Sequence, residues 1–162
     1  MVVKGGIYGQ DERNSVMKIV DTSKSSDNTE KLKLEISAYR DLESLQGKII
    51  PKVHGFLLIH NWIMVLVLSQ CGERIKGHEF VARYDEIRGM LKKIHAAGVA
   101  HRDLAHRNIL VDMKQKLTII DFSDANLRSS STEEDFRNHC KEDLNSLEWL
   151  LKKSKSDSDQ EF

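Results

Sequence analysis

The sequence of 162 residues has only one proline, Pro51, and two cysteines, Cys71 and Cys140. A single proline excludes a proline-rich linker protein. The two cysteines are too far apart to suggest a metal site or a disulfide framework, so we expect reduced, intracellular thiols. Aromatic residues make up only 6% of the chain, but its length is sufficient for one domain with a packed core.

The chain also lacks net charge, because 25 Lys and Arg balance 25 Asp and Glu. This balance argues against nucleic acid or an anionic membrane as the main partner. The N-terminus has no apolar signal core, and the longest apolar stretch, 56–68, is too short to span a bilayer. These absences predict a soluble, intracellular protein, with the cytoplasm as its expected location.

Hydrophobic periodicity predicts short strands and one long helix in the first part of the chain. Strands are expected at 2–3 and 15–20, with a turn over 5–11 between them. A helix is expected over 27–45, because Asp27 and Glu30 form a capping pair at its start. Gly47 would end this helix.

The rest of the chain alternates between strands and helices. Two buried strands are expected at 56–59 and 62–68, joined as a hairpin. A second long helix covers the apolar residues of 80–94, and two short strands follow it. A third helix would begin at a capping box of Ser131 and Glu134. Strands come mostly first and helices mostly later, which indicates an α+β fold in two lobes.

The strongest chemical signal lies in two strings, His-Arg-Asp-Leu-Ala-His-Arg-Asn-Ile-Leu at 101–110 and Ile-Ile-Asp-Phe-Ser at 119–123. They resemble the catalytic loop H-R-D-L-x-x-x-N and the strand leading into D-F-G of the protein kinases. The two motifs occur in the kinase order and at the kinase separation. The segment 94–99 is also similar to the one that leads into the kinase catalytic loop.

This resemblance implies ATP and Mg²⁺ as cofactors, with Asn108 and Asp121 as metal ligands. Their oxygen atoms suit magnesium, which takes only a few ligands from a protein. Asp103 would accept the proton of the attacking hydroxyl, whereas His101 is expected to be a packed structural residue. We also expect Arg107 to be a catalytic residue. With Arg107, the string resembles H-R-D-L-A-A-R-N of tyrosine kinases. The alternative is a set of incidental polar residues on a helix, a turn and two strands.

The string Val-Met-Lys-Ile at 16–19 resembles V-A-I-K, whose Lys contacts the ATP phosphates. Glu35 lies beside the apolar stripe of the first helix, where a charged group needs a partner. We therefore expect Lys18 and Glu35 to form the ion pair typical of kinases, and both to take part in binding ATP. The alternatives are a solvent-facing Lys18 and a solvated Glu35.

Two further segments match the kinase order. Ser69 to Cys71 follow the predicted hairpin where kinases have their hinge, so their backbone groups are expected to meet adenine. The alternative is a plain loop. Asp143 begins a string that resembles the kinase helix D-x-W-S-L-G, whose Asp braces the catalytic loop. An ordinary solvated Asp on an amphipathic helix is the other interpretation of Asp143.

The sequence departs from the kinase pattern at three points. Gly5, Gly6 and Gly9 do not fit the spacing G-x-G-x-x-G, so the first strand and the glycine loop are expected to be missing. Ser123 replaces the Gly of D-F-G, which restricts the backbone. No A-P-E string follows, and only 21 residues separate Asp121 from Asp143.

These observations predict a shortened, kinase-like bilobal domain over 1–153, with a small sheet and one helix in the first lobe and a minimal helical second lobe. The lobes would span about 1–68 and 73–153, with a hinge at about 69–72 and a disordered tail at 154–162. The expected function is ATP-dependent phosphorylation of protein hydroxyls.

Two other functions remain open at this stage. One is a nucleotide-binding pseudokinase or kinase fragment without catalysis, which the missing glycine loop favours. The other is a small-molecule phosphotransferase of the aminoglycoside- or choline-kinase type, against which Arg102 argues. The sequence does not reveal the protein substrate, its Ser/Thr or Tyr specificity, or the oligomeric state.

Overall fold

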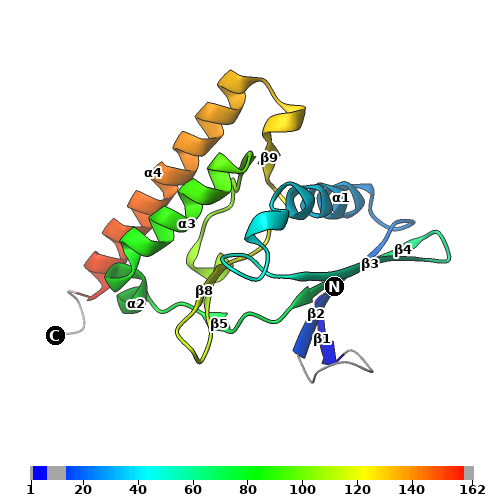
Figure 1. The fold of residues 1–162 in the computed structure, drawn as a ribbon, viewed down its shortest axis with the longest axis horizontal. Coiled ribbons are helices and arrows are strands. Elements are labelled where there is room, and N and C mark those ends of the chain that lie inside the picture. The colour runs from blue at the N-terminus through cyan, green and yellow to red at the C-terminus, as the bar shows by residue number, and fades with distance from the viewer. Residues whose placement is uncertain (1, 7–13, 159–162) are drawn as a thin grey trace.

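A computed structural model describes residues 2–6 and 14–158 of the chain, with side chains over 15–156. The first part forms one antiparallel sheet with a helix on it (Figure 1). Its elements are β1 (Val2–Gly6), β2 (Asn14–Asp21), α1 (Ser26–Asp41), the short 3-10 helix η1 (Glu43–Leu45), β3 (Val53–Ile59) and β4 (Ile63–Ser69). The predicted strands at 2–3 and 15–20 are confirmed. However, Gly5 and Gly6 belong to β1, and the rest of the predicted turn lies outside the described residues.

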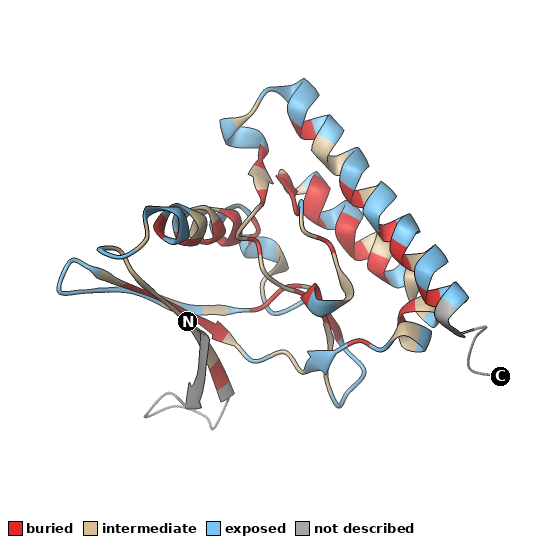
Figure 2. Cartoon of the chain, turned by 180° about the vertical axis from the view of Figure 1, so that it is seen from behind, coloured by how far each residue is buried: buried red, intermediate tan, exposed pale blue. Residues whose placement is uncertain are grey.

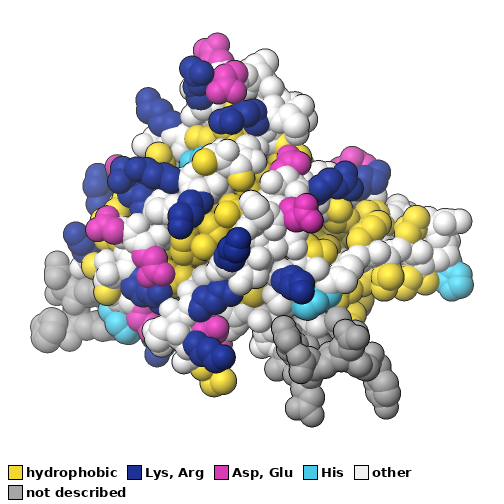
Figure 3. All heavy atoms as spheres, viewed as in Figure 1, with side chains coloured by type: hydrophobic (Ala, Val, Ile, Leu, Met, Phe, Trp, Pro, Cys, Tyr) yellow, Lys and Arg dark blue, Asp and Glu magenta, His cyan; other side chains and the backbone are white. Residues whose placement is uncertain are grey.

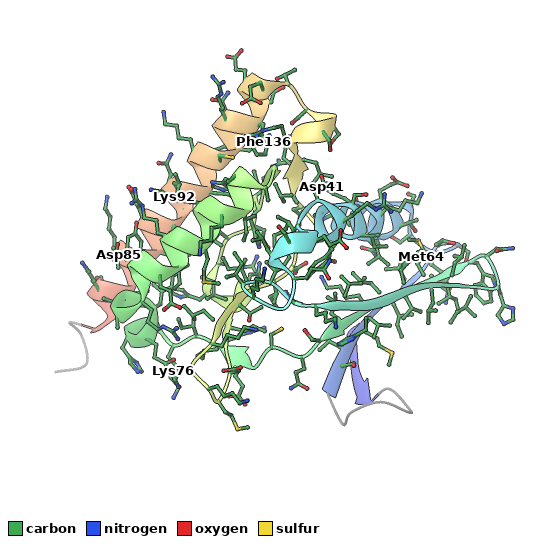
Figure 4. All side chains as sticks on the ribbon, in the orientation of Figure 1. Asp41, Met64, Lys76, Asp85, Lys92 and Phe136 are labelled. Carbon is green, nitrogen blue, oxygen red and sulfur yellow. The ribbon has the colours of Figure 1, made fainter. Side chains whose placement is uncertain are left out.

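The sheet has the strand order β1-β2-β4-β3. Lys18 on β2 lies opposite Leu66 on the central strand β4. Helix α1 packs against β2 and β4, and Met64, Leu66 and Leu68, which alternate along β4, belong to the hydrophobic core. Met64 on β4 and Phe136 on the last helix, both labelled in Figure 4, are buried in the two halves of the molecule.

The prediction of two buried strands is correct for β4 and wrong for β3. Phe56, Leu57, Leu58 and Ile59 on β3 are 40–52% exposed. These side chains are exposed because β3 is an outer strand of the described sheet and α1 packs on β2 and β4 instead. Figure 3 shows hydrophobic side chains gathered over the β3–β4 hairpin. A run of apolar residues does not reveal by itself whether its strand is central or at an edge.

The second part is mainly helical (Figure 1). Its elements are β5 (Glu73–Arg74), α2 (Gly77–Ala82), α3 (Tyr84–Ala96), β6 (Val99–Ala100), η2 (His106–Asn108), β7 (Ile109–Val111), β8 (Leu117–Ile119), β9 (Asn126–Leu127), η3 (Arg128–Ser130) and α4 (Glu133–Ser158). Strands β5, β7 and β8 form one small sheet, and β6 pairs with β9. Helices α3 and α4 lie side by side with buried inner faces (Figure 2). No helix of the described chain is long and apolar enough to cross a membrane.

The helix boundaries differ from the predicted ones because other polar side chains take the capping positions. The Ser25 hydroxyl accepts the N–H of Asn28, so α1 begins before the expected pair. Thr132 caps α4, since its hydroxyl accepts the N–H of Asp135 at 3.1 Å. The expected second helix is divided at Arg83 into α2 and α3.

The C-terminal segment also corrects a prediction. Helix α4 continues to Ser158, so residues 154–158 are helical and not disordered. Ser154 explains part of this, because its side chain is only 3% exposed and its hydroxyl lies 3.1 Å from Nε2 of His106. The remaining residues, 159–162, lie outside the described part of the chain.

Asp143 on α4 fixes the loop that follows β6. Its carboxylate is 2% exposed and accepts the backbone N–H groups of His101 and Arg102, each at 2.7 Å. It also lies 2.8 Å from Nε2 of His95 on α3. Arg102 has a φ of +64°, which is uncommon for a residue other than glycine and is held here by this carboxylate. The interpretation of Asp143 as a solvated residue is therefore wrong.

We expect Asp143→Ala to lower the free energy of unfolding by about 3 kcal/mol, because two buried N–H groups would lose their acceptor. Denaturant unfolding monitored by circular dichroism measures this loss. Glu148→Ala removes an exposed carboxylate from the same helix and should change stability by less than about 0.5 kcal/mol. Equal stability of the two variants would show that Asp143 does not brace the loop.

Gly72, between β4 and β5, is expected to tolerate no side chain. Its φ is +106°, and an added Cβ would lie 2.1 Å from the carbonyl oxygen of Val111. Gly72→Ala should therefore cost about 2–5 kcal/mol of stability in thermal or denaturant unfolding. Gly89 on α3 has no atom within 4 Å of the added Cβ, so Gly89→Ala should stabilise by up to about 1 kcal/mol. A well-tolerated Gly72→Ala would contradict this close approach of the two segments.

Candidate active site

Lys18 connects three separate elements at the centre of the molecule. Its ammonium group on β2 donates to both carboxylate oxygens of Glu35 on α1, each at 2.7 Å. It also donates to Oδ1 of Asp121, which follows β8, at 2.7 Å. The side chain of Glu35 is 1% exposed and that of Lys18 is 21% exposed. The Lys18–Glu35 ion pair is thus present as predicted, and Asp121 is a second partner.

The charges of this group depend on one another. Burial disfavours the charge of Lys18, but Glu35 and Asp121 outweigh it and hold the pKa of the ammonium group above its usual value. Burial raises the pKa of Glu35, and the contact with Lys18 opposes that rise. Burial would also raise the pKa of Asp121, but Lys18 overcomes this effect and keeps it below the usual range. Asp121 is therefore an ionised oxygen donor at neutral pH.

The loop 101–108 places Asp103 beside Arg107 and Asn108. The Arg107 guanidinium donates to both carboxylate oxygens of Asp103, at 2.5 and 2.6 Å. The Asn108 amide nitrogen donates to the backbone oxygen of Asp103 at 2.8 Å and to Oδ2 at 3.0 Å. Arg107 is 53% exposed, so its ion pair with Asp103 is of the weak, solvent-screened kind.

His101 is a structural residue, as the sequence predicts. It is fully buried, its Nε2 lies 2.9 Å from the carbonyl oxygen of Ile120, and its Nδ1 accepts the N–H of Asp103. Burial lowers the pKa of this imidazole, which keeps it neutral. Its ring packs on Phe122 at 5.1 Å, and Phe122 meets Tyr39 edge-on at 5.4 Å. These three rings connect the loop to α1 through the Asp-Phe-Ser motif.

A cavity of about 540 Å³ lies between the four-stranded sheet and the loop 101–108. This volume is in the range that binds small molecules and cofactors. The cavity gathers nearly all the predicted site residues, namely Lys18, Ser69, Cys71, Arg107, Asn108 and Asp121, together with residues that include Val16, Tyr39, Leu68 and Leu110. Glu35 lines a second cavity of about 510 Å³ on the other side of Lys18. Asp103 is not among the residues that line the first cavity, but it is bonded to Arg107 and Asn108, which do line it.

In the predicted hinge, fewer backbone groups are free to bind a ligand than the sequence suggests. The N–H of Ser69 donates to the carbonyl oxygen of Lys52, and its hydroxyl accepts the N–H of Lys52, both at 2.9 Å. Ser69 therefore cannot offer its N–H to a base. No hydrogen bond joins the backbone of Gln70 or Cys71 to another described residue. Of the residues predicted to meet adenine, Gln70 and Cys71 therefore have main-chain groups available to a ligand.

The oxygen donors of this site fit magnesium. Asp121 supplies a carboxylate, and Asn108 supplies an amide oxygen because its nitrogen is bound to Asp103. Magnesium in phosphate chemistry takes one or two carboxylates and completes its shell with phosphate and water. The described residues contain no group of three His, Cys, Asp or Glu that could hold a metal by themselves. Asn108 and Asp121 would hold such an ion together with phosphate and water oxygens.

The sequence does not indicate two features of the site and one contact beside it. Tyr39 lines the cavity, but in the sequence it is only one of several apolar residues at helical spacing. The Arg107–Asp103 ion pair is also not indicated, because a spacing of four residues brings side chains together on an α-helix and 101–105 is not helical. Lys31 on α1 pairs with Asp124 at 3.2 Å, just after the Asp-Phe-Ser motif. No pattern in the sequence marks this last contact, because its partners lie 93 residues apart (124 minus 31).

Comparison with known proteins gives a consistent result. A family model for the protein kinase domain matches residues 2–154. The serine/threonine-protein kinase ksg1 of Schizosaccharomyces pombe is 27% identical over 150 residues, which is 78% of this chain and 25% of the relative. The maternal embryonic leucine zipper kinase of Xenopus tropicalis is 30% identical over 117 residues, 65% of this chain and 17% of the relative.

The serine/threonine-protein kinase PknD of Chlamydia muridarum is 30% identical over 80 residues, 47% of this chain and 9% of the relative. The chain thus spans a quarter or less of the length of these curated relatives. The family match covers most of the chain, and it agrees with the order of the motifs and with their assembly around one cavity. This chain belongs to the protein kinase domain family.

Proposed function

We propose that this domain binds ATP with magnesium and transfers the terminal phosphoryl group to a protein hydroxyl. The observation that carries the proposal is the group of Lys18, Asn108 and Asp121 around one cavity, with Asp103 bonded to Asn108. Phosphoryl transfer needs positioning and charge neutralisation more than covalent chemistry, and this set supplies both. Two of the three relatives are named serine/threonine-protein kinases, which supports a protein substrate.

The residues have distinct roles in this proposal. Lys18 contacts the phosphates and exchanges its bond to Asp121 for phosphate oxygens, while Glu35 keeps the ammonium group in place. Asn108 and Asp121 would hold magnesium, which supplies neutralisation of the phosphate charge. Gln70 and Cys71 bind the base through their main chain. Val16, Leu68 and Leu110 provide apolar surface on either side of it.

Asp103 accepts the proton of the attacking hydroxyl. Both of its oxygens are bound by Arg107 in the free domain, so one of these bonds must open for the hydroxyl to approach. Because Arg107 is exposed, its ion pair is weak and opening it requires little free energy. If the pair stays closed instead, the domain binds nucleotide without transferring phosphate, which is the second candidate function.

A test of phosphotransfer uses labelled ATP, magnesium and casein as a general acceptor protein. We expect transfer or autophosphorylation by the wild type and a loss of at least about 100-fold in Asp103→Asn, because the base is removed. Asp85→Asn changes an exposed carboxylate on α3 and should leave the rate unchanged. Undiminished transfer by Asp103→Asn would remove Asp103 from its proposed role.

A separate test measures nucleotide binding by the thermal midpoint of unfolding. ATP at about 100 times its dissociation constant should stabilise the wild type by about 2.7 kcal/mol, roughly 5–10 °C. EDTA should abolish the shift, and Asp121→Asn should reduce it strongly, because the ion loses its carboxylate.

Asp124→Asn is the matched control for binding, since Asp124 is 44% exposed, pairs with Lys31 and does not line the cavity. Its shift with ATP should equal that of the wild type. A shift without transfer would favour the nucleotide-binding pseudokinase. The absence of any shift in the wild type, at all magnesium concentrations, would contradict nucleotide binding itself.

A further inference from the structure

Strand β3 and the turn that follows it carry most of the exposed large hydrophobic side chains of the described chain. Seven such side chains are exposed, and five of them lie on this hairpin, whereas Met113 lies in the β7–β8 turn and Trp149 on α4. Scattered exposed hydrophobic residues are normal, but a contiguous group of them marks an interaction site. We call these five residues the β3 patch: Phe56, Leu57, Leu58, Ile59 and Trp62, each 40–52% exposed.

The β3 patch covers both faces of the sheet. Phe56 pairs with Leu66 on β4, and Leu66 belongs to the core that α1 covers. The next residue, Leu57, pairs with Val65. Because cross-strand partners share a face and neighbours along a strand alternate, Phe56 lies on the face of α1 and Leu57 on the opposite face. A helix packed on the sheet would cover one of these faces only, whereas a strand added beside β3 would cover both.

The free edge of β3 is open to such a strand. Beyond its ladder with β4, the backbone of 56–58 forms no hydrogen bond with another described residue. Edge strands are usually protected by charged residues, proline or a bulge, but β3 contains no Asp, Glu, Lys, Arg or Pro. Its irregularity, between Val53 and Gly55, precedes the patch. The hairpin also reaches beyond the end of α1 (Figure 1), so another molecule can approach it.

A second copy of β3 fits this edge. Two copies related by a two-fold axis can pair as antiparallel strands. With Leu57 opposite Leu57 of the second copy, Phe56 of each copy meets Leu58 of the other, so apolar residues meet on both faces. No Asp, Glu, Lys or Arg on β3 opposes the approach of an identical strand. The two described sheets would then form one continuous sheet, of a size found in natural proteins.

The area of the patch agrees with a weak dimer. A whole aromatic side chain has about 150–250 Å² of surface, so five large side chains at 40–52% exposure leave roughly 500 Å² in each copy. Two copies would bury about 1,000 Å² of such surface, which is near the lower limit of specific interfaces. We therefore expect a dissociation constant in the micromolar range.

We propose that two copies of the domain associate through antiparallel pairing of their β3 strands, which covers the β3 patch on both faces. The inference does not depend on nucleotide binding, because no residue of β3 lines either of the two cavities beside Lys18. It assigns a function to the strand whose exposure the sequence does not predict.

Sedimentation velocity of the whole chain, from about 1 to about 300 µM, tests the association. We expect the wild type to change from monomer to dimer over this range. Leu57→Lys should raise the dissociation constant at least about 100-fold, because it places like charges opposite each other in a buried pair. Met113→Lys makes the same change at an exposed apolar residue of the β7–β8 turn and should dimerise as the wild type does.

Circular dichroism separates association from folding. Leu57 is 52% exposed, so Leu57→Lys should keep the helical spectrum of the wild type at concentrations where both are monomeric. If Leu57→Lys does not fold, a cross-linking variant that keeps β3 uncharged carries the test.

In that variant, Leu57→Cys, the new thiols of two copies would face each other. Opposite residues of antiparallel strands have Cα atoms about 4.5–5.5 Å apart, which is within the range of a disulfide. We expect mild oxidation to give a covalent dimer on a non-reducing gel. The wild type, which retains Cys71 and Cys140, and Met113→Cys should give no such product.

The other outcomes would overturn the inference. A wild type that stays monomeric at every concentration would assign the β3 patch to a different partner protein. Equal dimerisation of a folded Leu57→Lys would place the interface elsewhere on the molecule. A dimer without the Leu57→Cys cross-link would contradict the pairing of the strands, and assemblies larger than a dimer would contradict the closed two-fold arrangement.

Discussion

The ammonium group of Lys18 is the interaction on which the site depends. Through its bonds to Glu35 and Asp121, it joins a strand of the sheet, the helix packed on that sheet and the segment after β8. A largely buried cation between two carboxylates is stable only while its partners remain in place, because each charge left alone would be costly. The position of α1 and the position of Asp121 are therefore fixed together.

Two further connections give the site its shape. The buried rings of His101, Phe122 and Tyr39 join the loop 101–108 to α1 through one tilted and one edge-on contact. Asp143 holds the same loop from the opposite side, through backbone N–H groups that have no other acceptor in the described structure. The loop carries Asp103 and Asn108 on a backbone that includes a strained residue, Arg102. Strain of this kind persists only where the surroundings determine the conformation completely, and here a carboxylate and an aromatic stack do so.

Much of this organisation can be predicted from the sequence, because its signals are local. The motif at 101–110, the Lys18–Glu35 pair and the order of strands and helices all follow from short patterns with fixed spacing. The exposure of β3 does not follow from such a pattern, because it depends on which strands α1 covers. The helical end of α4 cannot be predicted either. A charged, serine-rich segment is typical of disorder, and the sequence does not indicate the buried contact of Ser154. The lobe and hinge boundaries, and the roles of the site residues, remain predictions.

The place of Asp143 in the chain has a consequence for how the domain is made. The loop 101–108 leaves the ribosome about 40 residues before the carboxylate that fixes its backbone, since Asp143 is 42 residues after His101. Until α4 has been synthesised, the strained backbone at Arg102 has no acceptor to hold it. A nascent chain therefore contains every recognisable motif of the site well before it can arrange them. Assembly of the site therefore follows the synthesis of a helix that contributes no group to the cavity itself.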